Sequence, residues 1–318
     1  RRHADQNIKM RKHNPKIVSS RYSSGVSDGI DHGNIVCNMA LSQGKTILFE
    51  QMSRKAACIV YKIPLFNYKK AWRAQKSLST FLRESRDAIN ADVYHRLIVV
   101  QHPSVYTLGR GSSLSNLKFD PNSGEEELLR VERGGEVTWH GPGQVVAYPI
   151  FDLTYTPLKK DLHWFMNGVE ESVITTLQNY NVEGVRSSVN NGVWVKNNKI
   201  AAVGVTASRW ITMHGLALNI DPDMDAYDKI VPCGITEPGH GVTSLSRELG
   251  QAFKPNDAHS FDAVATDLAE SIGQVFDMDI VHCQNPDTEL DIFTEMHPTA
   301  DKLLPIETPK STLEARVE

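Results

Sequence analysis

Residues 133–144 combine a glycine-rich backbone with side chains that can donate hydrogen bonds. Four glycines and a proline fall within these twelve residues. Glycine admits positive φ and lets the backbone approach a ligand closely. Arg133, His140 and Gln144 place hydrogen-bond donors in the same segment. This composition predicts a ligand-binding loop, and the alternative is a structural turn whose polar residues bind nothing.

Cys233 is the cysteine whose local sequence most favours chemistry. Pro232 fixes φ before it, and Gly234 frees the backbone after it. The other cysteines lie in a presumed linker, in an apolar strand and near the C-terminus (Cys37, Cys58, Cys283). A lone cysteine is more often a small buried hydrophobe, and a reactive thiol needs an accessible, electropositive setting. The spacing alone therefore leaves both interpretations of Cys233 open.

Lys199 begins a segment whose following side chains are small. Ala201, Ala202 and Gly204 leave room beside the lysine for a substrate. Lysines at strand ends are usually solvated, so this feature alone is a weak indication of function.

Composition limits the class of protein. The chain has 318 residues, of which 40% are hydrophobic, and a net charge of −4. This is enough apolar content for a core, and no basic stripe predicts nucleic-acid binding. No run approaches the roughly 18 apolar residues of a membrane-spanning helix. The cysteines form no CxxC pair and the histidines are scattered, which favours a reducing compartment and predicts no metal site.

The elements that must position these segments can be predicted from hydrophobic periodicity. Apolar runs predict strands at residues 58–63, 97–100, 145–150, 192–195, 200–205 and 213–220. Helical spacing predicts helices at residues 68–86, 161–177 and 260–276, the second capped by Asp161. Strands grouped between a few helices predict an α+β fold, with a sheet flanked by helices in one domain over residues 56–283.

The two ends of the chain differ from this domain. Residues 1–27 hold seven Lys or Arg, one acid and five serines. Such composition predicts that residues 1–55 form an organelle transit peptide and linker, with a disordered basic tail as the alternative. Residues 284–318 are polar and contain four prolines, so they are expected to be mostly extended or disordered.

Several segments, taken together and in this order, resemble the lipoyl(octanoyl) transferase family. The matching strings are HPSVYTLGR at 102–110, RGGEVTWHGPGQVVAYPI at 133–150, GVWVKNNKIAAVGV at 192–205, RWITMHGLALNI at 209–220, and PCGI with GVTSL at 232–245. The resemblance covers residues 57–280, and its long glycine-rich motif is specific.

The resemblance implies a mixed β-sheet flanked by helices, as in the biotin and lipoate protein ligases. It also implies that Cys233 is an acyl-thioester nucleophile and that Lys199 favours its thiolate form. The implied substrate-binding residues are Arg133, Gly134, Gly135, Glu136, Val137, Thr138, Trp139, His140, Ala202, Val203, Gly204, Gly215, Leu216 and Ala217. Asn191, where many relatives have threonine, and Thr206–Ala207, often basic or bulkier in relatives, depart from the pattern and leave the details of the pocket open.

The resemblance further implies an enzyme of protein lipoylation that needs no cofactor and no metal. The donor would be octanoyl-acyl carrier protein, and the acceptors would be lipoyl domains of 2-oxoacid dehydrogenase E2 subunits and the glycine cleavage H protein. A monomer without nucleic-acid or membrane partners is expected. With the basic leader, the expected location is mitochondrial, with plastid or cytoplasm as alternatives. The competing functions are an ATP-dependent lipoate or biotin ligase and a non-catalytic module that binds acylated carrier protein.

Overall fold

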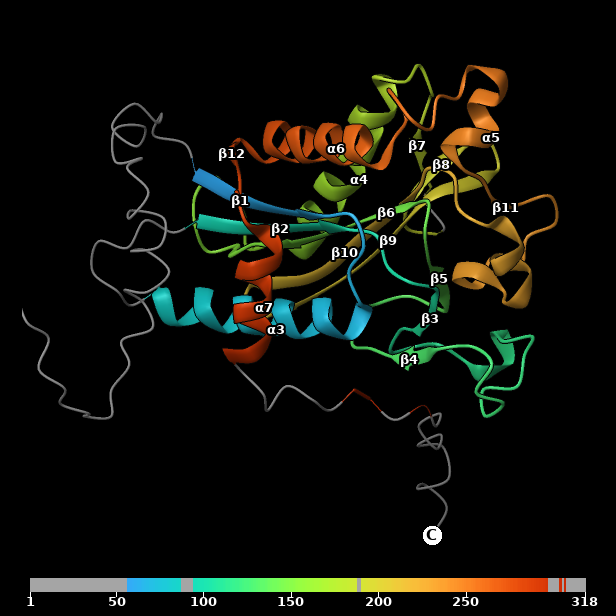
Figure 1. Cartoon of the computed structure of the whole chain (residues 1–318), viewed down its shortest axis with the longest axis horizontal. Helices are drawn as coiled ribbons and strands as arrows, with labels where there is room; N and C mark the ends of the chain where they lie inside the picture. The colour runs from blue at the N-terminus through green and yellow to red at the C-terminus, as the bar shows by residue number, and fades with distance from the viewer. Residues whose placement is uncertain (1–55, 87–93, 188–189, 297–302, 305, 307–318) are drawn as a thin grey trace, which may run out of the picture. The chain divides into compact units, whose positions relative to one another are not determined.

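The computed structural model describes residues 56–86, 94–187, 190–296, 303, 304 and 306 (Figure 1). The predicted leader and linker at residues 1–55 lie outside the described residues, so what was expected there stays a prediction.

A mixed nine-stranded sheet forms the centre of the fold. Its strands run in the order β12 (Met278–His282), β1 (Ala56–Ile63), β2 (Tyr94–Val100), β6 (Gln144–Ile150), β10 (Ile211–Asn219), β9 (Asn198–Ser208), β8 (Val193–Val195) and β7 (Val185–Arg186), with β11 (Gly241–Val242) beside β9. Strand β1 pairs in parallel with β12 and β2, whereas β6, β10, β9, β8 and β7 continue antiparallel. The predicted mixed sheet is confirmed, and all six predicted strands belong to it.

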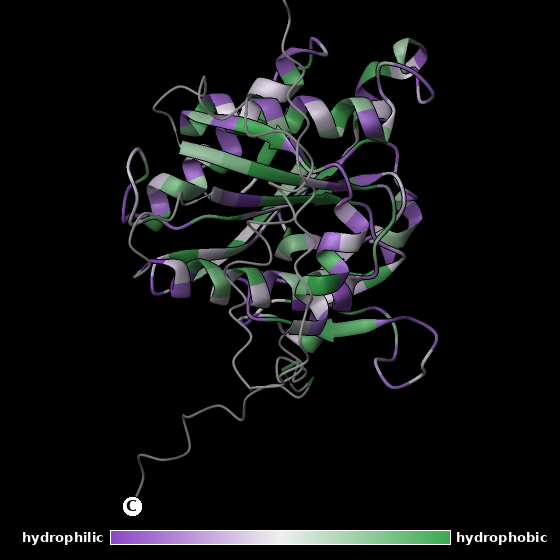
Figure 2. Ribbon diagram, turned by 60° about the vertical axis from the view of Figure 1, so that its left-hand side comes forward, coloured by the Kyte–Doolittle hydropathy of each residue, from purple (hydrophilic) through white to green (hydrophobic). Residues whose placement is uncertain are grey.

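Helices cover both faces of this sheet. Helices α4 (Leu162–Gln178) and α6 (Phe261–Phe276) lie on one face, and α3 (Tyr68–Ser85) and α7 (Pro286–Met296) lie on the other (Figure 1). The central strands are largely hydrophobic (Figure 2). Asp161 caps α4 as predicted, because its side chain accepts hydrogen bonds from the N–H groups of His163 and Trp164.

Aromatic rings fill the core between the sheet and α4 and α6. Phe151, Phe165 and Phe276 are each at most 2% exposed, and their ring centroids lie 5.4 to 6.0 Å apart. Gly168 permits this packing, because a Cβ there would lie 2.6 Å from the Phe276 ring. These contacts fix α4 against the sheet, and α4 supplies one wall of the site described below.

The expectation that the C-terminal region is extended is wrong for residues 286–296, which form α7. Leu290 and Phe293 are buried, and the Phe293 ring contacts Phe81 of α3 at 5.9 Å. Lys70 of α3 also pairs with Asp291 at 3.3 Å. The segment is rich in charged residues, and burial of Leu290 and Phe293 on one face stabilises it as a helix.

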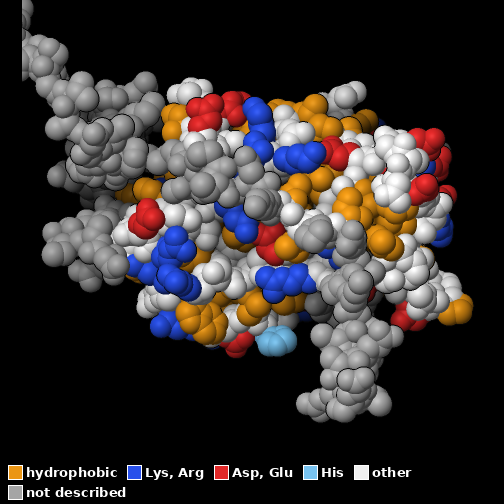
Figure 3. Space-filling view, turned by 90° about the horizontal axis from the view of Figure 1, so that it is seen from below, with side chains coloured by type: hydrophobic (Ala, Val, Ile, Leu, Met, Phe, Trp, Pro, Cys, Tyr) orange, Lys and Arg blue, Asp and Glu red, His pale blue; other side chains and the backbone are white. Residues whose placement is uncertain are grey.

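Basic side chains are visible on the face that carries α3 (Figure 3). Lys69 pairs with Glu127, and Lys76 pairs with Glu132. Lys69–Glu127 is an exposed pair and contributes at most about 1 kcal/mol, whereas the Glu132 side chain is only 14% exposed. Both pairs offset the positive charge on this face.

A second, three-stranded sheet was not predicted. It has the order β4 (Leu128–Arg130), β3 (Val105–Leu108), β5 (Thr138–His140). Strand β5 lies inside the glycine-rich segment, where a loop was expected, because pairing with β3 orders it. Arg130 also joins the far C-terminal part to this sheet, since its carbonyl accepts from the N–H of Leu304 and its guanidinium donates to the carbonyl of Ile306.

The remaining short elements lie in the connections between strands and helices. They are α5 (Leu245–Leu249) and the 3₁₀ turns η1 (Leu114–Asn116), η2 (Met224–Lys229), η3 (Pro232–Gly234) and η4 (Gly250–Ala252). Among the helices described, none has the length and hydropathy needed to cross a membrane.

Gly143 allows the glycine-rich segment to turn into β6. Its φ is +85° and its carbonyl accepts hydrogen bonds from the N–H groups of Ile220 and Asp221. A Cβ at Gly143 would lie 2.1 Å from the Asp221 carbonyl oxygen, whereas at Gly124, with φ +77°, nothing lies within 4 Å.

We expect Gly143→Ala to lower the free energy of unfolding by more than about 2 kcal/mol, because strain and clash add. The matched control Gly124→Ala introduces only the strain of a left-handed backbone conformation and should lower the free energy of unfolding by about 1 kcal/mol. Urea unfolding of both variants measures the difference. Equal losses would show that the close approach to Asp221 does not constrain the fold.

Candidate active site

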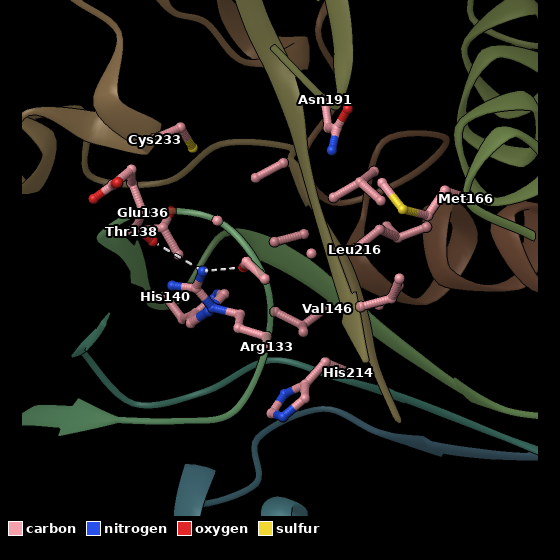
Figure 4. Close-up of a pocket in the computed structure, with 18 of the residues that line it drawn as sticks. Arg133, Glu136, Thr138, His140, Val146, Met166, Asn191, His214, Leu216 and Cys233 are labelled. Atoms are coloured by element: carbon pink, nitrogen blue, oxygen red, sulfur yellow. Dashed lines mark hydrogen bonds between the residues drawn. The ribbon is translucent and has the colours of Figure 1, made fainter. Parts of the chain in front are cut away.

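A cavity of about 330 Å³ lies where the glycine-rich segment meets β9, β10 and the η3 turn (Figure 4). Cys233 stands on one side of it, and Val146, Met166 and Leu216 stand on the other (Figure 4). The lining is therefore divided between polar groups near the glycine-rich segment and apolar side chains near α4 and the sheet.

Most of the residues singled out in the sequence meet in this cavity. They are Arg133, Gly134, Gly135, Glu136, Thr138, His140, Lys199, Ala202, Val203, Gly204, Gly215, Leu216, Ala217 and Cys233. Val137 and Trp139 do not line it. Strand alternation turns them to the opposite side, where they pack with Tyr106 and Tyr227 in a separate core cluster.

Eight lining residues were not identified from the sequence. They are Tyr68, Val146, Tyr148, Met166, Asn190, Asn191, Val205 and His214. The two-residue periodicity of β6 could have indicated Val146 and Tyr148, because they alternate with Ala147 on that strand. Tyr68 and Met166 come from α3 and α4, and no local pattern marks them as site residues.

The η3 turn presents Cys233 to the cavity in an unusual backbone conformation. Its φ is 54° and its ψ is 19°, which costs a non-glycine residue about 1 to 2 kcal/mol. The N–H of Cys233 donates to the Val137 carbonyl at 2.8 Å, and the N–H of Gly234 donates to Val231 at 3.2 Å. These bonds hold the turn, and they occupy two N–H groups beside the thiol, so neither is free to stabilise an oxyanion.

Lys199 is a buried cation that lines the cavity. The residue is only 2% exposed, although its position at the start of a strand is one that usually leaves lysine solvated. Its Nζ donates to Oδ1 of Asn190 and lies 5.1 Å from the centre of the Trp194 ring. Glu170 of α4 is also close enough for the Lys199 charge to lower its pKa, although burial raises the pKa of Glu170 overall.

Arg133 organises the glycine-rich segment from inside. One of its terminal nitrogens donates to the carbonyls of Gly134 and Glu136, and the other donates to the carbonyl and hydroxyl of Thr107. Gly204 of β9 lies close to the glycine-rich backbone, because a Cβ there would lie 3.0 Å from the Gly134 carbonyl oxygen. Arg133 therefore shapes the backbone that faces the cavity.

His140 contributes a neutral surface rather than a titrating group. Burial lowers its pKa to about 3. Its Nδ1 lies 2.7 Å from Oε1 of Gln144, an acceptor, and its Nε2 lies 3.4 Å from the Thr107 hydroxyl. The proton therefore resides on Nδ1, and Nε2 accepts from Thr107. His140 is unsuited to general-base catalysis in this arrangement.

The described part of the chain shows no cluster of side chains that could bind a metal ion. No group of three or more His, Cys, Asp or Glu side chains is arranged there to hold an ion.

Buried histidines make the fold sensitive to acid. Burial lowers the pKa of His95 and His102 to about 4 and that of His140 to about 3. Between pH 6.5 and about 4 the unfolded chain binds protons that the folded chain does not, so stability is complete above that window and falls as the pH falls through it.

We expect the free energy of unfolding, measured in urea, to decrease from pH 7 to pH 5, by up to about 1.4 kcal/mol per pH unit for each such histidine. His102→Gln should reduce this slope, and His163→Gln, an exposed control, should leave it unchanged. A slope that His102→Gln does not alter would contradict the assignment.

The chain resembles known proteins over most of its described part. It matches the lipoyl protein ligase A/B catalytic domain family over residues 67–271. An octanoyltransferase of Nostoc sp. is 42% identical over 224 residues, covering 70% of this chain and 94% of that protein. An octanoyltransferase of Gloeobacter violaceus is 47% identical over 188 residues, covering 59% and 81%. A chloroplastic octanoyltransferase of Arabidopsis thaliana is 42% identical over 229 residues, covering 71% and 80%.

Solved structures share the fold at low sequence identity. A lipoate-protein ligase A bound with ATP superposes with a TM-score of 0.56 at 11% identity, covering 76% of this chain and 95% of that one. A putative lipoate protein ligase from T. acidophilum gives a TM-score of 0.55 at 11% identity, covering 75% and 93%. The predicted ligase-like fold is thereby confirmed, and the chain belongs to the lipoyl protein ligase A/B catalytic domain family.

Proposed function

We propose that this protein is an octanoyltransferase of protein lipoylation, which moves an octanoyl group from a carrier thioester to a lysine of a lipoyl domain. One observation carries the proposal: Cys233 and Lys199 line the same small cavity. The names of the Nostoc and Gloeobacter relatives support the same activity.

The cavity suits a medium-length acyl chain. Its volume of about 330 Å³ lies at the small end of the range for ligand pockets. Val146, Met166 and Leu216 form the apolar wall opposite Cys233 (Figure 4). Burying the six methylenes of an octanoyl chain there would contribute about 5 kcal/mol. We therefore place the acyl chain between Cys233 and Met166.

The first chemical step exchanges one thioester for another. The Cys233 thiolate attacks the octanoyl carbonyl carbon, the carbon–sulfur bond to the carrier breaks, and the carrier leaves as a thiolate that takes up the proton given up by the Cys233 thiol. Lys199 supports this step, because a nearby cation favours thiolate over thiol. Its ammonium has three N–H groups, so it can also donate to the tetrahedral oxyanion while it is bonded to Asn190.

The second step forms an amide. The neutral amine of the acceptor lysine attacks the acyl carbon on Cys233, the new carbon–nitrogen bond forms and the carbon–sulfur bond breaks. The proton lost by the amine passes to the departing sulfur, which restores the Cys233 thiol. An amide is more stable than a thioester, so this step draws the reaction forward. The carrier thioester supplies the activation, and neither nucleotide nor metal enters either step.

The donor and acceptors are those that the resemblance to the lipoyl(octanoyl) transferase family implies. We propose octanoyl-acyl carrier protein as donor and the lipoyl domains of 2-oxoacid dehydrogenase E2 subunits and of the glycine cleavage H protein as acceptors, with the enzyme acting as a monomer. We further propose that residues 1–55 direct the chain to an organelle. The chloroplastic Arabidopsis relative favours the plastid over the mitochondrion.

An ATP-dependent lipoate ligase is the competing function. The structural similarity to an ATP-bound lipoate-protein ligase A motivates it. Such an enzyme activates a free acid by adenylation and requires no cysteine nucleophile, so dependence on ATP and on Cys233 separates the two activities.

Intact-protein mass spectrometry after mixing the enzyme with octanoyl-acyl carrier protein, without ATP, tests the proposal. We expect a mass gain of one octanoyl group that hydroxylamine removes. Cys233→Ala should abolish the adduct and reduce transfer by at least about 10³-fold, as loss of a nucleophile does. Cys283→Ala, the matched control, should retain both, since burial raises the pKa of that thiol to about 12. Transfer that requires ATP and free octanoate, without an adduct, would establish the ligase instead.

A further inference from the structure

We propose that Asn190 is a positioning residue that couples the Lys199 ammonium to the Cys233 turn. This inference rests on the proposed function, because it assigns the neighbour that orients the two reactive groups. Asn190 lies outside both the glycine-rich motif and the cysteine turn, and no local pattern marks it as a site residue.

The side-chain amide of Asn190 bonds to both groups at once. Its Oδ1 accepts from Nζ of Lys199 at 2.5 Å, and its Nδ2 donates to the Cys233 carbonyl at 3.2 Å. An ammonium only donates and a carbonyl only accepts, so these partners fix the orientation of the amide without ambiguity. Few neutral side chains offer an acceptor and a donor so close together.

Asn190 is itself held by the strands next to it. Its backbone carbonyl accepts from Nε1 of Trp194 at 3.1 Å, and its N–H donates to the Ser187 hydroxyl at 3.3 Å. The same Trp194 ring faces the Lys199 ammonium. The amide is therefore a fixed link between β8, β9 and η3 rather than a solvated side chain.

Other charged or titratable groups also face the two reactive residues. Burial lowers the pKa of Arg133 in the glycine-rich segment and raises the pKa of Tyr227 in η2, and both groups lie near enough to Cys233 to interact with its charge. Glu136 packs against Gly234. Glu170 of α4 faces Lys199 and Arg186. Within the described residues, none of these other groups forms hydrogen bonds with both Lys199 and Cys233, whereas Asn190 does.

The link has a chemical consequence. A lysine on a flexible four-carbon stem can occupy many positions, and its effect on a thiolate decreases with distance. Asn190 accepts a hydrogen bond from one of the three N–H groups of the ammonium. This bond holds the ammonium on the side of the cavity where the Cys233 turn lies. Asn190→Ala frees the ammonium, whereas the isosteric Asn190→Asp neutralises its charge and loses the donor to the Cys233 carbonyl.

Alkylation of Cys233 by iodoacetamide across a pH series tests this role without requiring octanoyl transfer. The rate is followed on the Cys233 peptide by mass spectrometry, and folding of each variant is checked by thermal unfolding. We expect the pH of half-maximal rate to rise by about one unit in Asn190→Ala, which is about tenfold slower alkylation at pH values well below both midpoints. The rise should be larger in Asn190→Asp, and the maximal rate at high pH should stay near that of the wild type.

The exposed Asn197, in the turn between β8 and β9, provides the matched control, and Asn197→Ala should leave the pH profile unchanged. An unchanged half-maximal pH in both folded Asn190 variants would overturn the proposal, as would a fall in the maximal rate alone, which indicates only a disturbed turn. A shifted profile in an enzyme that transfers no octanoyl group would uphold the role of Asn190 and refute the proposed function.

Discussion

The burial of one cation, the Lys199 ammonium, is the constraint around which this site is built. Removing an unpaired charge from water costs several kcal/mol, so a buried lysine requires compensation from its neighbours. Here an amide oxygen, an indole face and a carboxylate surround it, supplied by Asn190, Trp194 and Glu170. Asn190 lies in the segment before β8, Trp194 lies in β8 and Glu170 lies in α4. Holding the cation therefore fixes the arrangement of three separate parts of the fold.

The glycine-rich side of the cavity is held by hydrogen bonds and by burial. Arg133 donates from its two terminal nitrogens to backbone carbonyls and to Thr107, and burial keeps His140 uncharged. Arg133 and Lys199 both bring positive charge to the cavity, and Lys199 is the one that Asn190 links to the Cys233 turn. The apolar side chains Val146, Met166 and Leu216 remain free to face an acyl chain.

Local sequence pattern predicted the parts of the structure that depend on local chemistry. The Arg133–Gln144 segment and the Pro–Cys–Gly turn stood out because glycine and proline have distinct backbone preferences. Strand β5 and helix α7 were missed, because pairing with β3 and burial of Leu290 and Phe293 determine them. Asn190 and Met166 were missed for the same reason, since only tertiary packing brings them to the cavity.

In the proposed mechanism the acyl group passes through Cys233 on its way to the acceptor lysine. A rapid-quench experiment with purified acyl-enzyme, freed of carrier protein and mixed with a lipoyl domain, measures this transfer. We expect octanoyl to leave Cys233 and to appear on the acceptor lysine at the same rate, at least as fast as steady-state turnover. An acyl-enzyme that reacts more slowly than turnover, or that only hydrolyses, would contradict this mechanism.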